Sequence, residues 1–149
     1  MSELNDLYQE VIIDHSQRPH NYHAMAGASR TAEGYNPLCG DQVTVYLKLE
    51  GDKIQDVSFQ GRGCAISKAS ASIMTEVLKD KSSAEAEALF KMFHSLILGE
   101  KPVADEASLG KLAAFSGVHE FPTRVKCAIL AWHTVRSALT AQKGTVSTE

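Results

Sequence analysis

The sequence has little of what marks several common classes of protein. It has three cysteines in 149 residues, an odd and low number that excludes a secreted scaffold held together entirely by disulfides. No apolar run approaches the roughly 20 residues of a membrane span, and the first residues lack the basic and apolar segments of a secretory signal. A formal net charge of −3 argues against binding nucleic acid through a broad basic surface. We therefore expect a cytoplasmic protein with neither a membrane nor a nucleic acid as its partner.

The rest of the composition is that of an ordinary globular protein. Hydrophobic residues make up 44% of the chain and charged residues 22%. The length fits one domain and allows a real hydrophobic core. We expect a single domain over residues 1–149, in which the polar tail over 142–149 is frayed.

Hydrophobic periodicity predicts one helix, then strands, then several helices. Apolar residues between positions 4 and 12 recur at helical spacing, and Pro19 ends this helix. Strict alternation predicts a strand over 42–49, a turn at Gly51 leads into a second strand over 53–60, and a weaker strand is expected over 30–34.

Helical spacing returns after the second long strand. One helix follows Cys64. A second begins at the capping-box sequence that starts with Ser82, and this helix ends at Gly99. A short helix covers 109–115, and the last helix begins at Pro122. This order predicts an α+β fold, with helices packed on one face of a small antiparallel three-stranded sheet.

Each cysteine lies where two kinds of structure meet. Cys39 precedes the first long strand, Cys64 joins the second strand to a helix, and Cys127 lies in the first turns of the last helix. Because the two long strands form a hairpin, Cys39 and Cys64 are expected at the same end of it. A single free cysteine is often only a core residue, but three at such boundaries favour a shared site.

The residues around the cysteines favour thiolates. Gly40 and Gly63 allow close approach of the backbone, whose N–H groups can face a sulfur. The second and third cysteines lie near helix N-termini, where the helix dipole lowers a thiol pKa. Positive charge beside the cysteines comes from Arg62, Arg124 and Lys126.

Three cysteines can supply three of the four tetrahedral ligands that zinc requires. Asp41 is the best fourth, because residues i and i+2 of an extended segment point the same way and Asp41 follows Cys39 by two. An oxygen among sulfurs exchanges more easily than a fourth thiolate. His20 and His23, in the loop after the first helix, could approach such a site, but no pattern in the sequence places them there.

Three motifs carry a resemblance to a known family: the segments over 36–41, 61–67 and 121–128, which contain the three cysteines. At these motifs the chain resembles the U-type iron–sulfur cluster assembly proteins, the family of IscU, SufU and the N-terminal domain of NifU. It looks closest to the SufU type. Lys126 stands where IscU-type proteins have a histidine, and the segment between Cys64 and Cys127 is longer, with the surplus placed over 99–120.

The resemblance implies the fold of the SufE, IscU and NifU proteins and a tightly bound zinc held by Cys39, Asp41, Cys64 and Cys127. It implies a pyridoxal-phosphate cysteine desulfurase of the SufS type as partner, with the downstream iron–sulfur assembly machinery as recipient. We assign sulfur acceptance to Cys39, which lies on a glycine-bounded loop, and stabilisation of the sulfur anion to Arg124. The activity is then a sulfurtransferase-like half-reaction rather than independent turnover.

Two other interpretations stay open at this point. The same ligands could hold a [2Fe–2S] cluster, which would make the protein a scaffold on which a cluster is assembled and transferred. The zinc could also be purely structural. Lys126 favours sulfur transfer over the scaffold, but it does not decide between them.

Overall fold

The computed structural model describes residues 2–37, 40–100, 106–140 and 146–147. Helix α1 (Ser2–Gln17) precedes three strands, β1 (Arg30–Asn36), β2 (Asp41–Glu50) and β3 (Lys53–Arg62). Helices α2 (Ala65–Leu78) and α3 (Ser83–Ile97) follow, then the 3-10 segments η1 (Glu106–Phe115) and η2 (Val118–Glu120), helix α4 (Pro122–Leu139) and a short strand, β4 (Val146–Ser147).

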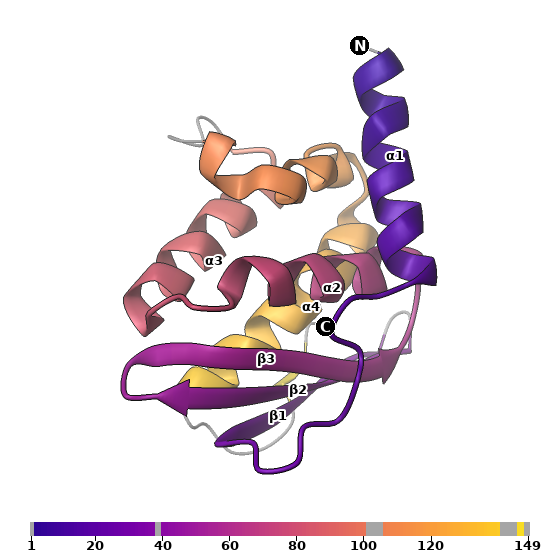
Figure 1. Ribbon diagram of the computed structural model, residues 1–149. Coiled ribbons are helices and arrows are strands. Elements are labelled where there is room, and N and C mark those ends of the chain that lie inside the picture. Colours follow the sequence, from indigo (N-terminus) through magenta and orange to yellow (C-terminus); the bar gives the residue numbers. More distant parts are fainter. Residues whose placement is uncertain (1, 38–39, 101–105, 141–145, 148–149) are drawn as a thin grey trace.

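The three long strands form the antiparallel meander that the sequence predicts. β2 pairs with β1 on one side and with β3 on the other. Side chains alternate along β2, so that Val43, Val45 and Leu47 are buried and Gln42 and Lys48 are exposed. Figure 1 shows α2 and α4 on the same side of this sheet. The predicted α+β class, with helices on one face of a small sheet, is confirmed.

The sheet also has a fourth strand that the sequence does not reveal. β4 runs parallel to β1, with Val146 opposite Gly34 and Ser147 opposite Tyr35. Two residues of the tail that we expect to be frayed over 142–149 therefore pair with the sheet, and the others of that tail lie outside the described residues. The physical reason is that β1 would otherwise be an edge strand, whose unpaired backbone groups accept another extended segment.

Local signals account for most of the helix boundaries. The capping box forms as expected, since the Ser82 Oγ accepts from the Glu85 N–H at 3.1 Å and the Glu85 Oε1 accepts from the Ser82 N–H at 3.0 Å. Pro122 occupies the first turn of α4. The short helix expected over 109–115 falls in η1, which is interrupted at Gly110.

The core lies between the sheet and the helices and centres on Trp132 of α4. This side chain is fully buried, stacks on Phe93 of α3 with 5.0 Å between ring centroids, and donates through Nε1 to the Ser70 Oγ of α2 at 3.2 Å. The small buried residues of α2 let its neighbours approach closely. In the described part of the chain, no helix combines the length and the apolar character needed to cross a bilayer.

Gly34 of β1 lies directly against α4 and gives a test of this packing. A Cβ at Gly34 would overlap the Thr134 hydroxyl and lie 3.1 Å from the Leu130 Cδ1. We expect Gly34→Ala to lower the free energy of unfolding by about 1–3 kcal/mol, as overpacking does. Urea denaturation measures this change.

Removing the obstructing hydroxyl should recover part of this loss. We therefore expect the double variant Gly34→Ala/Thr134→Ala to lose less free energy of unfolding than the two single variants lose in sum. Gly117→Ala is the matched control, because a Cβ there meets no atom within 4 Å. A Gly34→Ala protein as stable as the Gly117→Ala protein would contradict this account of the packing.

Candidate metal centre

Three elements of the fold bring a carboxylate and two thiols together. Asp41 is the first residue of β2, Cys64 follows β3 and caps α2, and Cys127 lies in the second turn of α4. The β2–β3 register places Gln42 opposite Arg62, so the start of β2 lies beside the end of β3. One ligand atom from each of Asp41, Cys64 and Cys127 lies within 4.8 Å of the other two.

Asp41 is fully buried, although a buried carboxylate is costly unless it is paired. Its Oδ1 accepts from the Cys64 backbone N–H at 2.9 Å. Its Oδ2 lies 3.7 Å from the Cys64 Sγ. One oxygen is therefore held by the backbone, while the other faces the thiols as a ligand would.

Cys64 has the properties of a thiolate. The hydrogen bond from the Cys127 thiol lowers the pKa of Cys64 most, and the backbone N–H groups of Ser67 and Ile66 lower it further. Burial and the charge of Asp41 oppose this effect, and the resulting pKa is about 6. The Ser67 N–H donates to the Cys64 Sγ at 3.4 Å, which makes the sulfur the N-cap of α2.

Cys127, on α4, is fully buried and contacts the last residue of β1. Its Sγ lies 3.5 Å from the carbonyl oxygen of Thr123 and 3.6 Å from the Asn36 Nδ2, which donates to it. Asn36 is itself buried and was given no role by sequence reasoning, although it begins the first cysteine motif. The hydrogen bond from its side-chain amide to the Cys127 sulfur is what identifies Asn36 as part of the site.

Arg124 supplies the positive charge beside both sulfurs. The pKa of its guanidinium is raised, first by the negative charge of Cys64 and then by a hydrogen bond with Cys127. Arg124 is exposed, so it lies between the thiols and solvent. Of the three basic residues that the sequence places near the cysteines, Arg124 interacts with the sulfurs. Arg62 is exposed, and Lys126 is half-buried.

Two glycines allow the backbone to approach the site closely, as the sequence predicts. A Cβ on Gly63 would lie 2.9 Å from the Asp41 Cγ, so only glycine leaves room for the carboxylate. Gly40 has a φ of 75°, a backbone conformation that favours glycine, and its N–H donates to the Asn36 carbonyl at 2.8 Å.

Cys39, the remaining sulfur of the expected ligand set, lies outside the described residues. Described residues on either side of it in the sequence contact the other two cysteines: Asn36 donates to the Cys127 sulfur, and Asp41 accepts from the Cys64 backbone N–H. The two loop histidines lie elsewhere. The His20 Nδ1 is 3.0 Å from the Glu76 Oε1, and the His23 Nδ1 is 3.0 Å from the Ala24 carbonyl oxygen.

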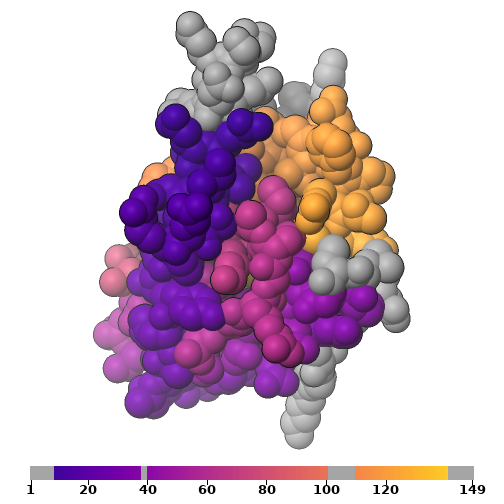
Figure 2. Space-filling model, turned by 90° about the vertical axis from the view of Figure 1, so that its right-hand side faces the viewer, coloured from indigo at the N-terminus to yellow at the C-terminus, as the bar shows by residue number. Residues whose placement is uncertain are grey.

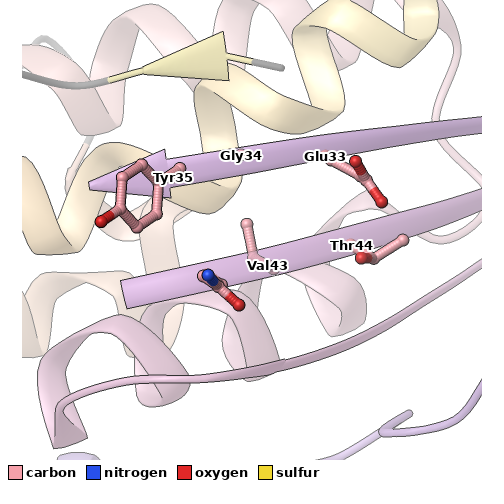
Figure 3. Close-up of a pocket in the computed structure, with 6 residues that line it drawn as sticks. Glu33, Gly34, Tyr35, Val43 and Thr44 are labelled. Atoms are coloured by element: carbon pink, nitrogen blue, oxygen red, sulfur yellow. The ribbon is translucent and has the colours of Figure 1, made fainter. Parts of the chain in front are cut away.

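A shallow pocket on β1 and β2 is chemically poorer than this site. Figure 3 shows it between the two strands, and its lining contains no thiol or imidazole: Glu33, Gly34, Tyr35, Gln42, Val43 and Thr44. A single carboxylate does not make a metal centre. The donors at the end of the sheet are therefore the better candidate.

A small α+β domain that gathers a carboxylate and thiols at one end of its sheet has the donor set of a thiolate-type metal site. The family can be stated more narrowly. The model of the NifU-like N-terminal domain matches residues 7–144, and the chain belongs to this family.

Its relatives have two kinds of name. The chain is 40% identical to the "iron-sulfur cluster assembly scaffold protein IscU" of Streptococcus pyogenes serotype M1, over 93% of this chain and 86% of the relative. It is 38% identical to the "zinc-dependent sulfurtransferase SufU" of Bacillus subtilis strain 168, over 96% of each chain. The predicted membership among the U-type iron–sulfur cluster assembly proteins is confirmed, and iron–sulfur cluster assembly is the function of this family.

Solved structures agree with this assignment. A putative iron–sulfur cluster assembly scaffold protein for the SUF system, from Fervidobacterium islandicum AW-1, matches with a TM-score of 0.82 and 41% identity, over 87% of this chain and 94% of that chain. A NifU-like N-terminal protein from Brucella abortus matches with a TM-score of 0.82 at 22% identity, over 93% of this chain and 98% of that chain, which supports the fold alone.

Gly63 tests whether the position of Asp41 matters for binding a metal. A Cβ at Gly63 must displace the carboxylate, so we expect Gly63→Ala to weaken zinc binding by about tenfold or more. Competition with a chromophoric zinc chelator measures the affinity. Gly117→Ala, which places a methyl in open space, should bind zinc like the wild type. Equal zinc affinity for Gly63→Ala and the wild type would show that Asp41 is not a ligand.

Proposed function

We propose that this protein is a zinc-dependent acceptor of persulfide sulfur in iron–sulfur cluster assembly. In this proposal the sulfur comes from a pyridoxal-phosphate cysteine desulfurase of the SufS type and passes on to the downstream assembly machinery. The convergence of Asp41, Cys64 and Cys127 carries the proposal. It occurs in a chain that is 38% identical, over 96% of both lengths, to a protein named a zinc-dependent sulfurtransferase.

The proposed ligands of the zinc are Cys39, Asp41, Cys64 and Cys127. The donor chemistry fits, because thiolates and a carboxylate oxygen are ordinary zinc ligands and the three described donors lie within one coordination shell's reach of each other. The lowered pKa of Cys64 and the buried Oδ2 of Asp41 support a cation at this point. Bound zinc would keep the cysteines deprotonated while restraining their nucleophilicity.

Cys39 is the proposed sulfur acceptor. Its thiolate attacks the terminal sulfur of the partner's cysteine persulfide, a new sulfur–sulfur bond forms on Cys39, and the partner's cysteine leaves as a thiolate. No oxidant or reductant is needed, because one sulfur–sulfur bond replaces another. Cys64 caps a helix and Cys127 is buried in one, so both are better suited to stay in place as anchors.

Arg124 is proposed to stabilise the persulfide anion that forms on Cys39. Its guanidinium already lies beside two sulfurs and is exposed to an approaching partner. Phe121, at the N-terminus of the same helix, is 58% exposed, an apolar contact next to the site for the desulfurase. The proposal places this chemistry in the cytoplasm, where thiols stay reduced.

The scaffold is the second candidate function, because the relative from Streptococcus pyogenes is named a scaffold protein. The same donors could hold a [2Fe–2S] cluster. Lys126, in place of the histidine of IscU-type proteins, favours sulfur acceptance. A purely structural zinc fits less well, since Cys64 is partly exposed and an exposed arginine stands beside it.

Anaerobic purification with metal analysis, a visible spectrum and a desulfurase assay separates the three functions. Sulfur acceptance predicts one zinc, no cluster absorbance and stimulation of the desulfurase. A scaffold predicts iron and acid-labile sulfide in near-equal amounts. A structural zinc module predicts one zinc and no stimulation.

Changing Cys39 tests the acceptor role. After incubation with the desulfurase and cysteine, we expect the wild-type peptide that contains Cys39 to gain the mass of one sulfur atom. Cys39→Ala should carry no added sulfur and should leave the desulfurase at its unstimulated rate. His23→Ala, which changes an exposed side chain that contacts its own loop, is the control and should behave like the wild type. Persulfide on Cys64 or Cys127, or an unchanged rate in Cys39→Ala, would overturn the assignment.

A further inference from the structure

A second group of metal-type donors lies at the opposite end of α2 from the cysteines. It consists of His15 in α1, His20 in the loop that follows, and Glu76 in α2, and one ligand atom of each lies within 4.8 Å of the others. Glu76 is twelve residues beyond Cys64, about 18 Å along the axis of α2. The two groups of donors are therefore separate, and the proposed sulfur chemistry does not use the second.

The distances from Glu76 to both histidines are those found in a coordination sphere. The Glu76 Oε1 lies 3.5 Å from the His15 Nε2 and 3.0 Å from the His20 Nδ1. The two imidazole rings are tilted by 43°, with centroids 4.5 Å apart. Donors that each bind one cation at about 2.0–2.2 Å lie about 3.0–3.5 Å from one another, so the donors need little movement to share an ion.

Ser72 holds both histidines in place. The His15 Nδ1 is 2.7 Å from the Ser72 Oγ, and the same oxygen accepts from the His20 backbone N–H at 2.7 Å. In the tautomer that carries its proton on Nδ1, the ring donates to Ser72 and the His15 Nε2 presents its lone pair toward Glu76 and Lys111. A hydrogen bond on the far nitrogen is the usual support of a metal-binding histidine.

Burial adds to this arrangement at His15. The side chain is 2% exposed, and burial is the main reason why the pKa of His15 is lowered. The neutral ring is the form that binds a metal. His20 and Glu76 are 43% and 34% exposed, so the group is open to solvent on one side and leaves positions for water on a bound ion.

Lys111 is the cation that faces these donors in the structure. Its Nζ lies 3.8 Å from the Glu76 Oε1 and 3.5 Å from the His15 Nε2. The Lys111 side chain is 52% exposed, so it can swing into solvent and make way for an ion. Figure 2 shows α1, α2 and the segment before α4 meeting on this surface of the protein.

We propose that His15, His20 and Glu76 form a second site, for a divalent transition-metal cation such as Zn²⁺. Two imidazoles and one carboxylate suit Zn²⁺ or Fe²⁺ better than the hard ions Mg²⁺ and Ca²⁺. The bound ion takes the place of the Lys111 ammonium. Because its ligands come from α1, the following loop and α2, it ties the end of α1 to the body of the protein.

Zinc binding to protein that already holds one zinc at the cysteines tests this site. Equilibrium dialysis with metal analysis should find a second, weaker equivalent of Zn²⁺. We expect His20→Ala and Glu76→Gln each to lose the second equivalent and keep the first. His23→Ala is the matched control, since this nearby histidine contacts only its own loop among the described hydrogen bonds, and it should keep both equivalents.

The Lys111→Met variant distinguishes a metal site from a purely structural cluster of side chains. Removing the competing ammonium should tighten the second equivalent several-fold. Retention of the first equivalent and an unchanged far-ultraviolet circular dichroism spectrum show that each variant is folded.

Three results would overturn the proposal: saturation at one equivalent, a second equivalent that survives both His20→Ala and Glu76→Gln, or no tightening in Lys111→Met. The group would then be a hydrogen-bonded link between helices. None of these results bears on the cysteine site, which is counted separately as the first equivalent.

Discussion

The candidate metal centre depends on one hydrogen bond of the buried Asp41 carboxylate, whose Oδ1 accepts from the Cys64 backbone N–H at 2.9 Å. It joins the first residue of β2 to the residue that caps α2, and it fixes the direction in which the other carboxylate oxygen points. Antiparallel pairing brings the two residues together, and the absence of a side chain at Gly63 leaves the space. Breaking this bond would leave a buried carboxylate without its backbone donor, which is costly.

The packing of α4 completes the arrangement around that bond. Trp132 and Gly34 hold α4 close to α2 and β1, so that Cys127, about one and a half turns before Trp132, lies beside Cys64. The same helix presents Arg124 to solvent beside the sulfurs. The start of β2, the N-cap of α2 and helix α4 therefore carry Asp41, Cys64 and Cys127, whereas Cys39, which we propose as the acceptor, lies outside the described residues.

Structure that depends only on neighbouring residues could be predicted from the sequence. Alternation along β2, the capping box at Ser82 and the proline that opens α4 each predict structure from a few neighbouring positions. The hairpin predicted that Cys39 and Cys64 lie at the same end of it, and Asp41, two residues after Cys39, does contact Cys64. The arrival of Cys127 depends on how α4 lies across the sheet, which spacing does not reveal, so for that residue the family resemblance supplied what periodicity did not.

Long-range packing explains what sequence reasoning missed. His15 is buried against Ser72, 57 residues further along the chain, and no local pattern predicts that contact. Its approach to Glu76 depends on the contact of α1 with α2, and the pairing of β4 with β1 likewise joins distant segments. The role of Asn36 required knowing that Cys127 comes within reach of its amide.

The central claim is that zinc is held by three thiolates and the Asp41 carboxylate. X-ray absorption spectroscopy at the zinc edge, on protein loaded with one equivalent of zinc, tests it most directly. The account predicts three sulfur scatterers at about 2.3 Å and one oxygen scatterer at about 2.0–2.2 Å. Loss of the oxygen scatterer in Asp41→Ala would agree with this assignment. A shell of two sulfurs or fewer, or a spectrum of Asp41→Ala identical to that of the wild type, would contradict it.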